Sequence, residues 1–388
     1  MLVYDKTLLD NTLLADEANS LKKSGFIDSG QYTYIENKLP SLKRQKNKSI
    51  RQGFFLLGIF LYSSICSMLS IFSIDDEYSN FQILLFIYSL IGFVGIELLA
   101  KKNFYDFGIE EAFLLGAQIL LFLGIGNATN ENYLVVCIAI AVISTICYLR
   151  YIHLSSALLA CIGITGCVVY FVFKFGSIGE SVLPFVLILF AAATYFLSKN
   201  SIKKLQLPYY LKGIQLANRF SLVLFYLSGN CLVVRELSIV WLKKNIPATQ
   251  EIDFAIFFYA FTLIVPVVYL VYSLIKKDKQ MLWIGFLAFC FSILTIRYYH
   301  QIIPAEIALT FGGLLLFAFT YFSIKKIKNK ETGITFLPDR FSDSNSLLNA
   351  EALIVASQFG LKPEIKPEES PMEFGGGDFS GGGSSGKF

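Results

Sequence analysis

Ten long apolar stretches, separated by short polar segments, dominate the chain and leave few folds open to it. A helix needs about 20 apolar residues to cross a bilayer, with ~17 as the lower limit. The stretches predict an all-α, polytopic transmembrane helix bundle with spans at 53–72, 81–100, 110–126, 133–149, 154–173, 182–198, 214–234, 254–275, 281–299 and 304–323. The third and sixth stretches are the shortest and the seventh is the most polar, so a count of nine or eight stays open.

The composition agrees with a bundle whose main partner is the lipid bilayer. The 388 residues are 55% hydrophobic and 16% charged. A soluble globular chain is roughly 45–50% apolar and about 25% charged. The basic residues lie between the apolar runs, with no separate basic domain, so their pattern argues against a nucleic-acid partner.

The cysteines carry no sign of a metal site or a disulfide framework. All seven lie within apolar runs, without a C-x-x-C pair or a neighbouring histidine: Cys66, Cys137, Cys147, Cys161, Cys167, Cys231 and Cys290. We interpret them as small buried hydrophobic residues. The sequence therefore predicts no metal and no cofactor.

The positions of the basic residues predict the orientation of the bundle. If the amino end is inside, the outer loops hold only five of the 33 Lys and Arg residues: Lys174, Arg235, Lys243, Lys244 and Arg297. Arg219 lies within a span, and the others are cytoplasmic. Because Lys and Arg in short loops stay inside, both termini are expected in the cytoplasm.

Residues 1–50 are expected to form a small cytosolic helical hairpin. Apolar residues from Leu8 to Leu21 follow a helical period, and Gly25 is a natural C-terminal stop. Asp28 or Ser29 then caps a second helix that runs to about Lys38. Two such helices are too small to bury a core alone. This polar opening has no h-region, so we expect no cleavable signal peptide.

The sequence Leu21-Lys-Lys-Ser-Gly-Phe-Ile-Asp-Ser-Gly-Gln31 resembles the short helix pair that opens a family of bacterial predicted membrane proteins. That family continues as about eight to twelve spans and has no established function. The resemblance covers some twenty residues and the general layout. It implies a bacterial inner membrane and supplies no active-site residues.

The tail that follows the bundle (51–325) has two parts. In 326–361, Ser344 is a candidate cap for an amphipathic helix that ends at Gly360. Residues 362–388 are rich in Gly, Ser and Pro and are expected to be disordered, with Phe374, Phe379 and Phe388 as candidate docking residues for a partner. This Gly-rich block is similar to the tails of bacterial membrane-anchored proteins that carry TPM domains, although the TPM domain itself is missing.

No pattern predicts catalysis. Asp75, Asp76 and Glu77 fall in a first outer loop that is too short to hold a donor and an acceptor sugar. The only two histidines, His153 and His300, lie at opposite ends of the predicted topology, so neither a zinc site nor a serine-hydrolase site can be assembled. We therefore do not expect an enzyme.

Polar residues within the spans are the candidate binding residues, because an Arg at the bilayer centre costs about 2.5–3.5 kcal/mol on insertion scales. Arg219 either snorkels to the inner headgroups or pairs with a buried ion or solute. Asn218 lies beside it and Asn230 further along the same span. Gln118 is expected to make an interhelical hydrogen bond. Glu97 is expected to snorkel or to pair with the nearby Lys101.

A second candidate group lies at the outer ends of the last spans. Arg297, His300 and Glu306 flank the hairpin between the ninth and tenth spans, and Arg235 and Glu236 lie at the same level. The group is interpreted as an interfacial salt-bridge network, with a binding site as the alternative.

Two functions stay open for such a chain. The first is a non-catalytic scaffold, sensor or accessory subunit that binds cytosolic or membrane proteins through the hairpin and the tail. The alternative is a secondary transporter or lipid flippase, for which polar spans and the in-span prolines Pro184 and Pro266 offer thin support.

Overall fold

The computed structural model describes residues 2–23, 26–71, 79–130, 132–204, 208–242, 254–276 and 278–300, together with scattered positions between 307 and 325. In this part of the chain the regular structure is helical, and β-type pairing is limited to an isolated bridge between Lys43 and Phe104. The all-α prediction is confirmed for these residues.

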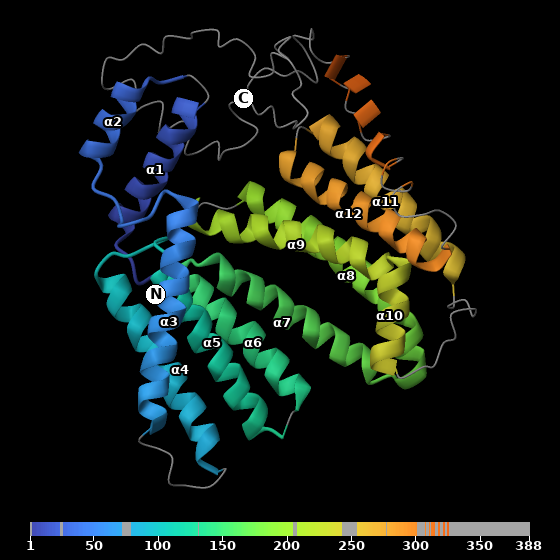
Figure 1. Cartoon of the computed structure of the whole chain (residues 1–388), viewed down its shortest axis with the longest axis horizontal. Helices are drawn as coiled ribbons and strands as arrows, with labels where there is room; N and C mark the ends of the chain where they lie inside the picture. Colours follow the sequence, from blue (N-terminus) through green and yellow to red (C-terminus); the bar gives the residue numbers. More distant parts are fainter. Residues whose placement is uncertain are drawn as a thin grey trace, which may run out of the picture.

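The helices follow one another with short connections. In chain order they are α1 (Lys6–Lys23), α2 (Ser29–Lys38), α3 (Lys48–Ile71), α4 (Ser79–Lys101), α5 (Ile109–Ala128), α6 (Tyr133–Tyr151), α7 (Leu154–Phe173), α8 (Gly176–Lys204), the 3₁₀ turn η1 (Pro208–Tyr210), α9 (Leu211–Gly229), α10 (Cys231–Leu242), α11 (Ala255–Lys276) and α12 (Lys279–His300). Figure 1 shows α1 and α2 at one end of α3, with α10 at the far end of α8 and α9.

Eight of these helices are long and apolar enough to cross a membrane: α3 to α8, α11 and α12. The pair α9 and α10 is bent by 72° and would make a ninth span if both halves belong to one crossing. The chain is therefore a multi-pass helical membrane protein by length and composition. More than half of the expected tenth span at 304–323 lies outside the described residues, so a count of ten stays a prediction.

Two expected boundaries differ from the structure. The sixth span was placed at 182–198, but α8 starts at Gly176 and ends at Lys204. Residues 176–181, which fall between the fifth and sixth predicted spans, form the start of that helix. The seventh span was placed at 214–234 as one stretch, but its helix ends at Gly229 and a second helix begins at Cys231. Pro184 and Pro266 lie within α8 and α11 and break neither helix.

Neighbouring helices pack closely where small residues face each other. Gly163 of α7 lies directly against the backbone of Ala141 in α6, and Gly116 of α5 lies against the ring of Tyr62 in α3. Membrane helices approach through such residues because lipid gives little hydrophobic drive for association. The outer surface is apolar instead, with side chains such as Phe60 (70% exposed) and Leu189 (70% exposed) facing outward.

The expected helical hairpin is present. Asp28 caps α2 through a capping box, in which its carboxylate accepts from the Gln31 backbone N–H and the Gln31 side chain accepts from the Asp28 N–H. Two reciprocal hydrogen bonds satisfy the free donors of the first turn and fix where the helix begins. A small apolar core then joins the two helices: Ala18, Leu21, Ile27, Tyr32 and Ile35.

Gly163→Ala is expected to weaken the α6–α7 pair. A Cβ at this position would lie 2.5 Å from the Ala141 nitrogen and 2.9 Å from its Cα, and backbone atoms cannot give way. Overpacking of this kind costs about 1–3 kcal/mol. Thermal unfolding of the purified protein in detergent measures the loss.

The matched control is Gly126→Ala in the last turn of α5. Its Cβ would meet only a Val136 methyl group at 3.7 Å, an ordinary contact. We expect no loss of stability there, since Ala favours a helix over Gly by about 1 kcal/mol. Equal destabilisation by both substitutions would contradict the close packing of α6 on α7.

Candidate functional site

A broken helix within the membrane-spanning region is the first candidate site. The chain leaves helical geometry at Asn230, whose backbone is extended (φ −74°, ψ 126°). The Asn230 Oδ1 accepts hydrogen bonds from the N–H groups of Leu232 (3.0 Å) and Val233 (3.3 Å). Asn is a strong N-cap residue because its side chain replaces the missing helical acceptor. One side chain therefore starts α10 where α9 stops.

The amide nitrogen of Asn230 joins a buried polar network. It donates to the hydroxyls of Tyr226 (2.9 Å) and Thr295 (3.2 Å), and the Tyr226 hydroxyl pairs with that of Ser292 at 2.8 Å. The Thr262 hydroxyl accepts from the Cys231 N–H at 3.0 Å. Each of these side chains is at most 3% exposed. The network thus ties the break to α11 and α12.

The network explains how the bend survives in an apolar environment. A lipid-exposed backbone N–H or C=O costs several kcal/mol, so a break is stable only where protein or trapped water replaces the helical partners. Here the side chains of Asn230 and Thr262 replace them for the first turn of α10. Broken helices with converging polar groups are also how many transporters build a midplane site.

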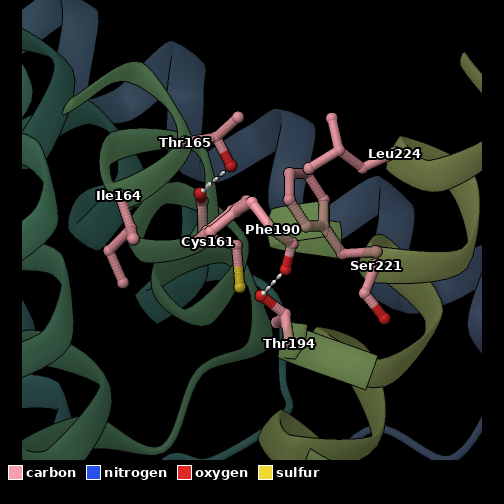
Figure 2. Close-up of a pocket in the computed structure, with 8 residues that line it drawn as sticks. Cys161, Ile164, Thr165, Phe190, Thr194, Ser221 and Leu224 are labelled. Carbon is pink, nitrogen blue, oxygen red and sulfur yellow. Dashed lines mark hydrogen bonds between the residues drawn. The ribbon is translucent and has the colours of Figure 1, made fainter. Parts of the chain in front are cut away.

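A small cavity lies on another part of α9. About 120 Å³ of space opens between α7, α8 and α9 and is lined by Cys161, Ile164, Thr165, Phe190, Thr194, Phe220, Ser221 and Leu224 (Figure 2). The hydroxyls of Thr165 and Thr194 donate to carbonyls one turn back in their own helices, each at 2.8 Å. The walls therefore present mainly hydrocarbon, which suits an apolar group better than a charged solute.

The structure does not bring the three candidate residues of the seventh span together. Asn218 donates to the Ser198 hydroxyl (3.0 Å) and the Tyr195 carbonyl (3.3 Å) of α8. Arg219 is half-buried, and the acidic group that acts on it is Asp278 at the turn between α11 and α12. Asn230 lies eleven residues further along and makes none of these contacts.

The two candidates in earlier spans act between helices. Gln118 is fully buried, and its Oε1 accepts from the Ser156 hydroxyl of α7 at 3.1 Å, which confirms the expected interhelical bond. Glu97 pairs with Arg150 of α6 (Oε1–Nη2 2.6 Å) and accepts from the Tyr151 hydroxyl (3.0 Å). Lys101, the partner expected from the sequence, acts on Glu97 only electrostatically, because the Arg150 guanidinium takes both carboxylate oxygens, with its Nε donating to Oε2 at 3.3 Å.

The predicted outer cluster is described only in part. Arg297 is exposed on α12, and Arg235 is 8% exposed on α10. Glu306 and the His300 side chain lie outside the described residues. So do Asp75–Glu77 and the tail with Phe374, Phe379 and Phe388. These predictions stay untested. Among the described residues no group of three metal-ligating side chains gathers.

The second candidate site is the interface between the spans and the head, a name used here for the α1–α2 hairpin together with the residues before α1. Its core takes Tyr4, Leu9 and Leu13 from the head, Leu42 from the segment before α3, and four residues from the ends of the spans: Ala100, Tyr105, Ile152 and Tyr209. The head thus completes its core on the α4–α5, α6–α7 and α8–α9 connections. Sequence reasoning missed this, since Leu9 and Leu13 look like an ordinary amphipathic stripe.

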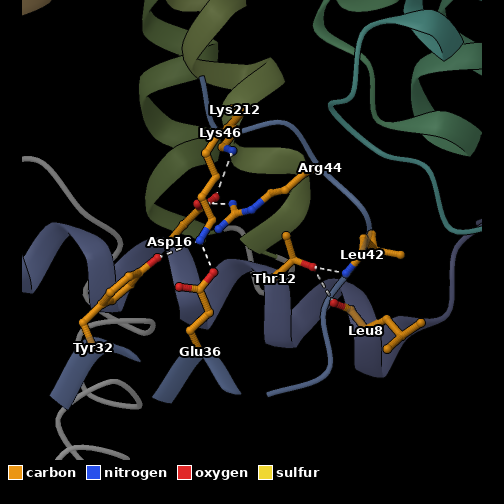
Figure 3. Close-up of polar contacts among 9 residues, drawn as sticks. All are labelled: Leu8, Thr12, Asp16, Tyr32, Glu36, Leu42, Arg44, Lys46 and Lys212. Atoms are coloured by element: carbon orange, nitrogen blue, oxygen red, sulfur yellow. Dashed lines mark hydrogen bonds and ion pairs between the residues drawn. The ribbon is translucent and has the colours of Figure 1, made fainter. Parts of the chain in front are cut away.

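Hydrogen bonds and ion pairs align the head on the spans. The Tyr4 hydroxyl donates to the Phe104 carbonyl (3.2 Å), and the Val3 N–H donates to the Arg150 carbonyl (3.2 Å). Figure 3 shows Asp16 between two cations: Arg44, with which it forms an ion pair, and Lys212 in the first turn of α9, 3.6 Å away. The head is therefore attached to the same helix that carries the break.

Burial keeps the phenols of this interface protonated. Desolvation, followed by the negative charge of Glu110, raises the pKa of Tyr4 far above its ordinary value. Desolvation likewise raises the pKa of Tyr105. A phenol with a raised pKa stays a hydrogen-bond donor throughout the physiological range. The Tyr4–Phe104 hydrogen bond is consequently independent of pH there.

No protein-family model matches the chain, and no curated protein or solved structure shows significant similarity to it. The resemblance of the head and the tail to bacterial membrane proteins accordingly stays a prediction. Functional inference rests on the chain's own residues.

Asn230→Leu is expected to destabilise the α9–α10 break by about 2–4 kcal/mol, because it removes the acceptor of the Leu232 and Val233 N–H groups and the donor to the Tyr226 and Thr295 hydroxyls. Ser228→Ala is the control at nearly the same depth, since its hydroxyl donates only to the Leu224 carbonyl of its own helix. Unfolding in detergent measures both. A loss for Asn230→Leu no larger than for Ser228→Ala would refute the role of the network.

Proposed function

We propose that the protein is a non-catalytic integral membrane component, a sensor or accessory subunit, in which the head passes an interaction on the cytosolic side to the spans. The supporting observation is the shared core: Tyr4, Leu9 and Leu13 are buried against the ends of the spans rather than within the head alone. A partner that moves the head must therefore move the α4–α5, α6–α7 and α8–α9 connections as well.

Helix α9 gives this coupling a route into the bilayer. It begins beside Asp16 of the head, through Lys212, and ends at the Asn230 network. At 1.5 Å per residue, its 19 residues form a rod about 28 Å long. A shift at its first turn displaces the break at its last turn, because a hydrogen-bonded helix moves as a unit.

The location that fits this proposal is a bacterial inner membrane with both termini in the cytoplasm. The basic run from Lys43 to Arg51 and the connections that the head contacts lie on one side of the bundle, and the positive-inside rule assigns such a side to the cytoplasm. The partners are then cytosolic or membrane proteins that contact the head or the Phe-containing tail.

Reporter fusions test this orientation. A fusion after residue 388, and one at the amino end, should be active only as cytoplasmic reporters. A fusion in the α7–α8 connection, next to Lys174, should be active only as an external reporter. The reverse pattern at any of the three positions would contradict the orientation.

Leu9→Ala is expected to release the head from the spans. Leu9 is 1% exposed in the shared core, and truncating a buried leucine costs about 2–5 kcal/mol. Hydrogen exchange of the full chain in nanodiscs should rise at residues 102–108 and 151–153 and in the first turn of α9.

Leu21→Ala is the matched control, because Leu21 is equally buried (3% exposed) but belongs to the head's own core with Ala18 and Ile35. It should loosen α1 and α2 and leave the span connections unchanged. The coupling proposal fails if Leu9→Ala and Leu21→Ala give the same exchange at those connections.

The broken helix favours a second candidate function, a secondary transporter or lipid flippase. The supporting observation is the 72° bend between α9 and α10 at a buried polar network. Proteoliposomes with labelled solutes and labelled lipids separate the two functions. The sensor or accessory role predicts no transfer, whereas transfer that is lost in Asn230→Leu and kept in Ser228→Ala would establish the second candidate.

A further inference from the structure

Arg219 holds a permanent positive charge inside the membrane-spanning region, and among the described residues it forms no ion pair. It is eight residues into α9, so its Cα lies about 12 Å from the start of the helix. Its Nε is buried and has no hydrogen-bond partner. In the part of the chain that the structure describes, no carboxylate lies within ion-pair distance of its guanidinium.

The acidic group that faces Arg219 is already engaged. Asp278 acts on Arg219 electrostatically from the turn between α11 and α12. Its Oδ1 accepts from the N–H groups of Gln280 (3.0 Å) and Met281 (3.1 Å), as an N-cap of α12 does. This exposed capping carboxylate attracts the Arg219 guanidinium without forming an ion pair. It therefore does not supply hydrogen-bond acceptors for the five N–H donors of Arg219.

Lys199 of α8 adds a second cation at the same edge. Its Nζ donates to the hydroxyls of Tyr272 (3.2 Å) of α11 and Tyr195 (3.4 Å) of α8, and neither phenol brings a negative charge. Tyr195 and Tyr272 pack against the core that holds Leu222 and Tyr226 of α9. Arg219 precedes these residues by three and seven positions, so all three share one helix face. Both cations therefore lie at the α11–α12 side of the bundle.

We propose that Arg219 and Lys199 bind the phosphate of an anionic lipid in the leaflet on the side of the head. A phosphate offers two non-bridging oxygens in the geometry that a guanidinium donates to, and an exposed Lys adds a point charge. The site lies between helices, near the end of the bundle that carries the head and the basic run from Lys43 to Arg51, where basic side chains meet lipid headgroups. A lipid headgroup and free inorganic phosphate offer the same phosphate oxygens, and only the lipid also carries acyl chains.

Lipid retention tests the site on the full chain. The protein is reconstituted into nanodiscs of phosphatidylcholine and phosphatidylglycerol, extracted into mild detergent, and its bound lipids are counted by mass spectrometry. The wild type should retain phosphatidylglycerol in excess of its share. Arg219→Gln and Lys199→Gln should each lower that enrichment about fivefold, the factor that ~1 kcal/mol per basic residue near the surface implies.

Lys174→Gln is the matched control. Lys174 also lies over a tyrosine ring, that of Tyr170 at 5.7 Å, but at the opposite end of the bundle. The phosphatidylglycerol enrichment of Lys174→Gln should equal that of the wild type. Arg219→Lys keeps the positive charge but loses the planar guanidinium that donates to two phosphate oxygens. This variant should retain part of the lipid enrichment.

Three results would overturn the proposal. The first is full enrichment in Arg219→Gln, which would mean that Arg219 only snorkels to bulk headgroups. The second is loss of the bound lipid on adding inorganic phosphate, which would make the site one for a free anion. The third is wild-type enrichment in Lys199→Gln. This variant alone decides between the outcomes if Arg219→Gln does not fold.

Discussion

The rule that every backbone polar group must find a partner inside the bilayer governs this structure. Six helices, α3 to α8, obey it in the simplest way, by keeping their hydrogen bonds within one continuous helix. The pair α9 and α10 obeys it differently. Because Asn230 replaces the helical acceptors of Leu232 and Val233, and Thr262 that of Cys231, the chain can turn by 72° while the freed N–H groups of α10 keep partners. The positions of α11 and α12 depend on this solution, since they supply Thr262 and Thr295.

The contact between the head and the spans follows from a second constraint, the minimum size of a stable hydrophobic core. Two helices of 18 and 10 residues bury little apolar surface between themselves. The structure supplies the missing surface from the ends of the spans, so Leu9 and Leu13 are buried against Ala100, Tyr105 and Ile152. A hairpin that is stable only in contact with the bundle is also one whose position depends on the bundle. The proposed coupling rests on this dependence.

The sequence predicted what depends on local pattern. Apolar length located the spans, and the expected cap at Asp28 or Ser29 located the start of α2, which the structure places at Ser29 after an Asp28 cap. It failed where tertiary contacts decide. The break at Asn230 lies inside a stretch that was predicted as one span, and although Ser228, Gly229 and Asn230 interrupt the apolar pattern there, nothing local says that Tyr226, Thr262 and Thr295 will gather around them. The choice of Arg150 over Lys101 as the partner of Glu97 likewise depends on how α4 and α6 come together. Gln118 was predictable because any buried amide needs a partner, although the identity of Ser156 was not.

Helix α9 shows how three polar residues can hold one helix in place along the membrane normal. Lys212 contacts the head, Arg219 lies near the same end but deeper, and Asn230 forms the break at the other end. A purely apolar helix can slide by a turn at little cost, since lipid and apolar neighbours solvate every position alike. Sliding α9 by one turn, about 5.4 Å, would remove Lys212 from Asp16 and Asn230 from Thr295 of α12 together. The two ends therefore fix each other's register, and Arg219 between them is held at one depth whether or not a ligand is bound.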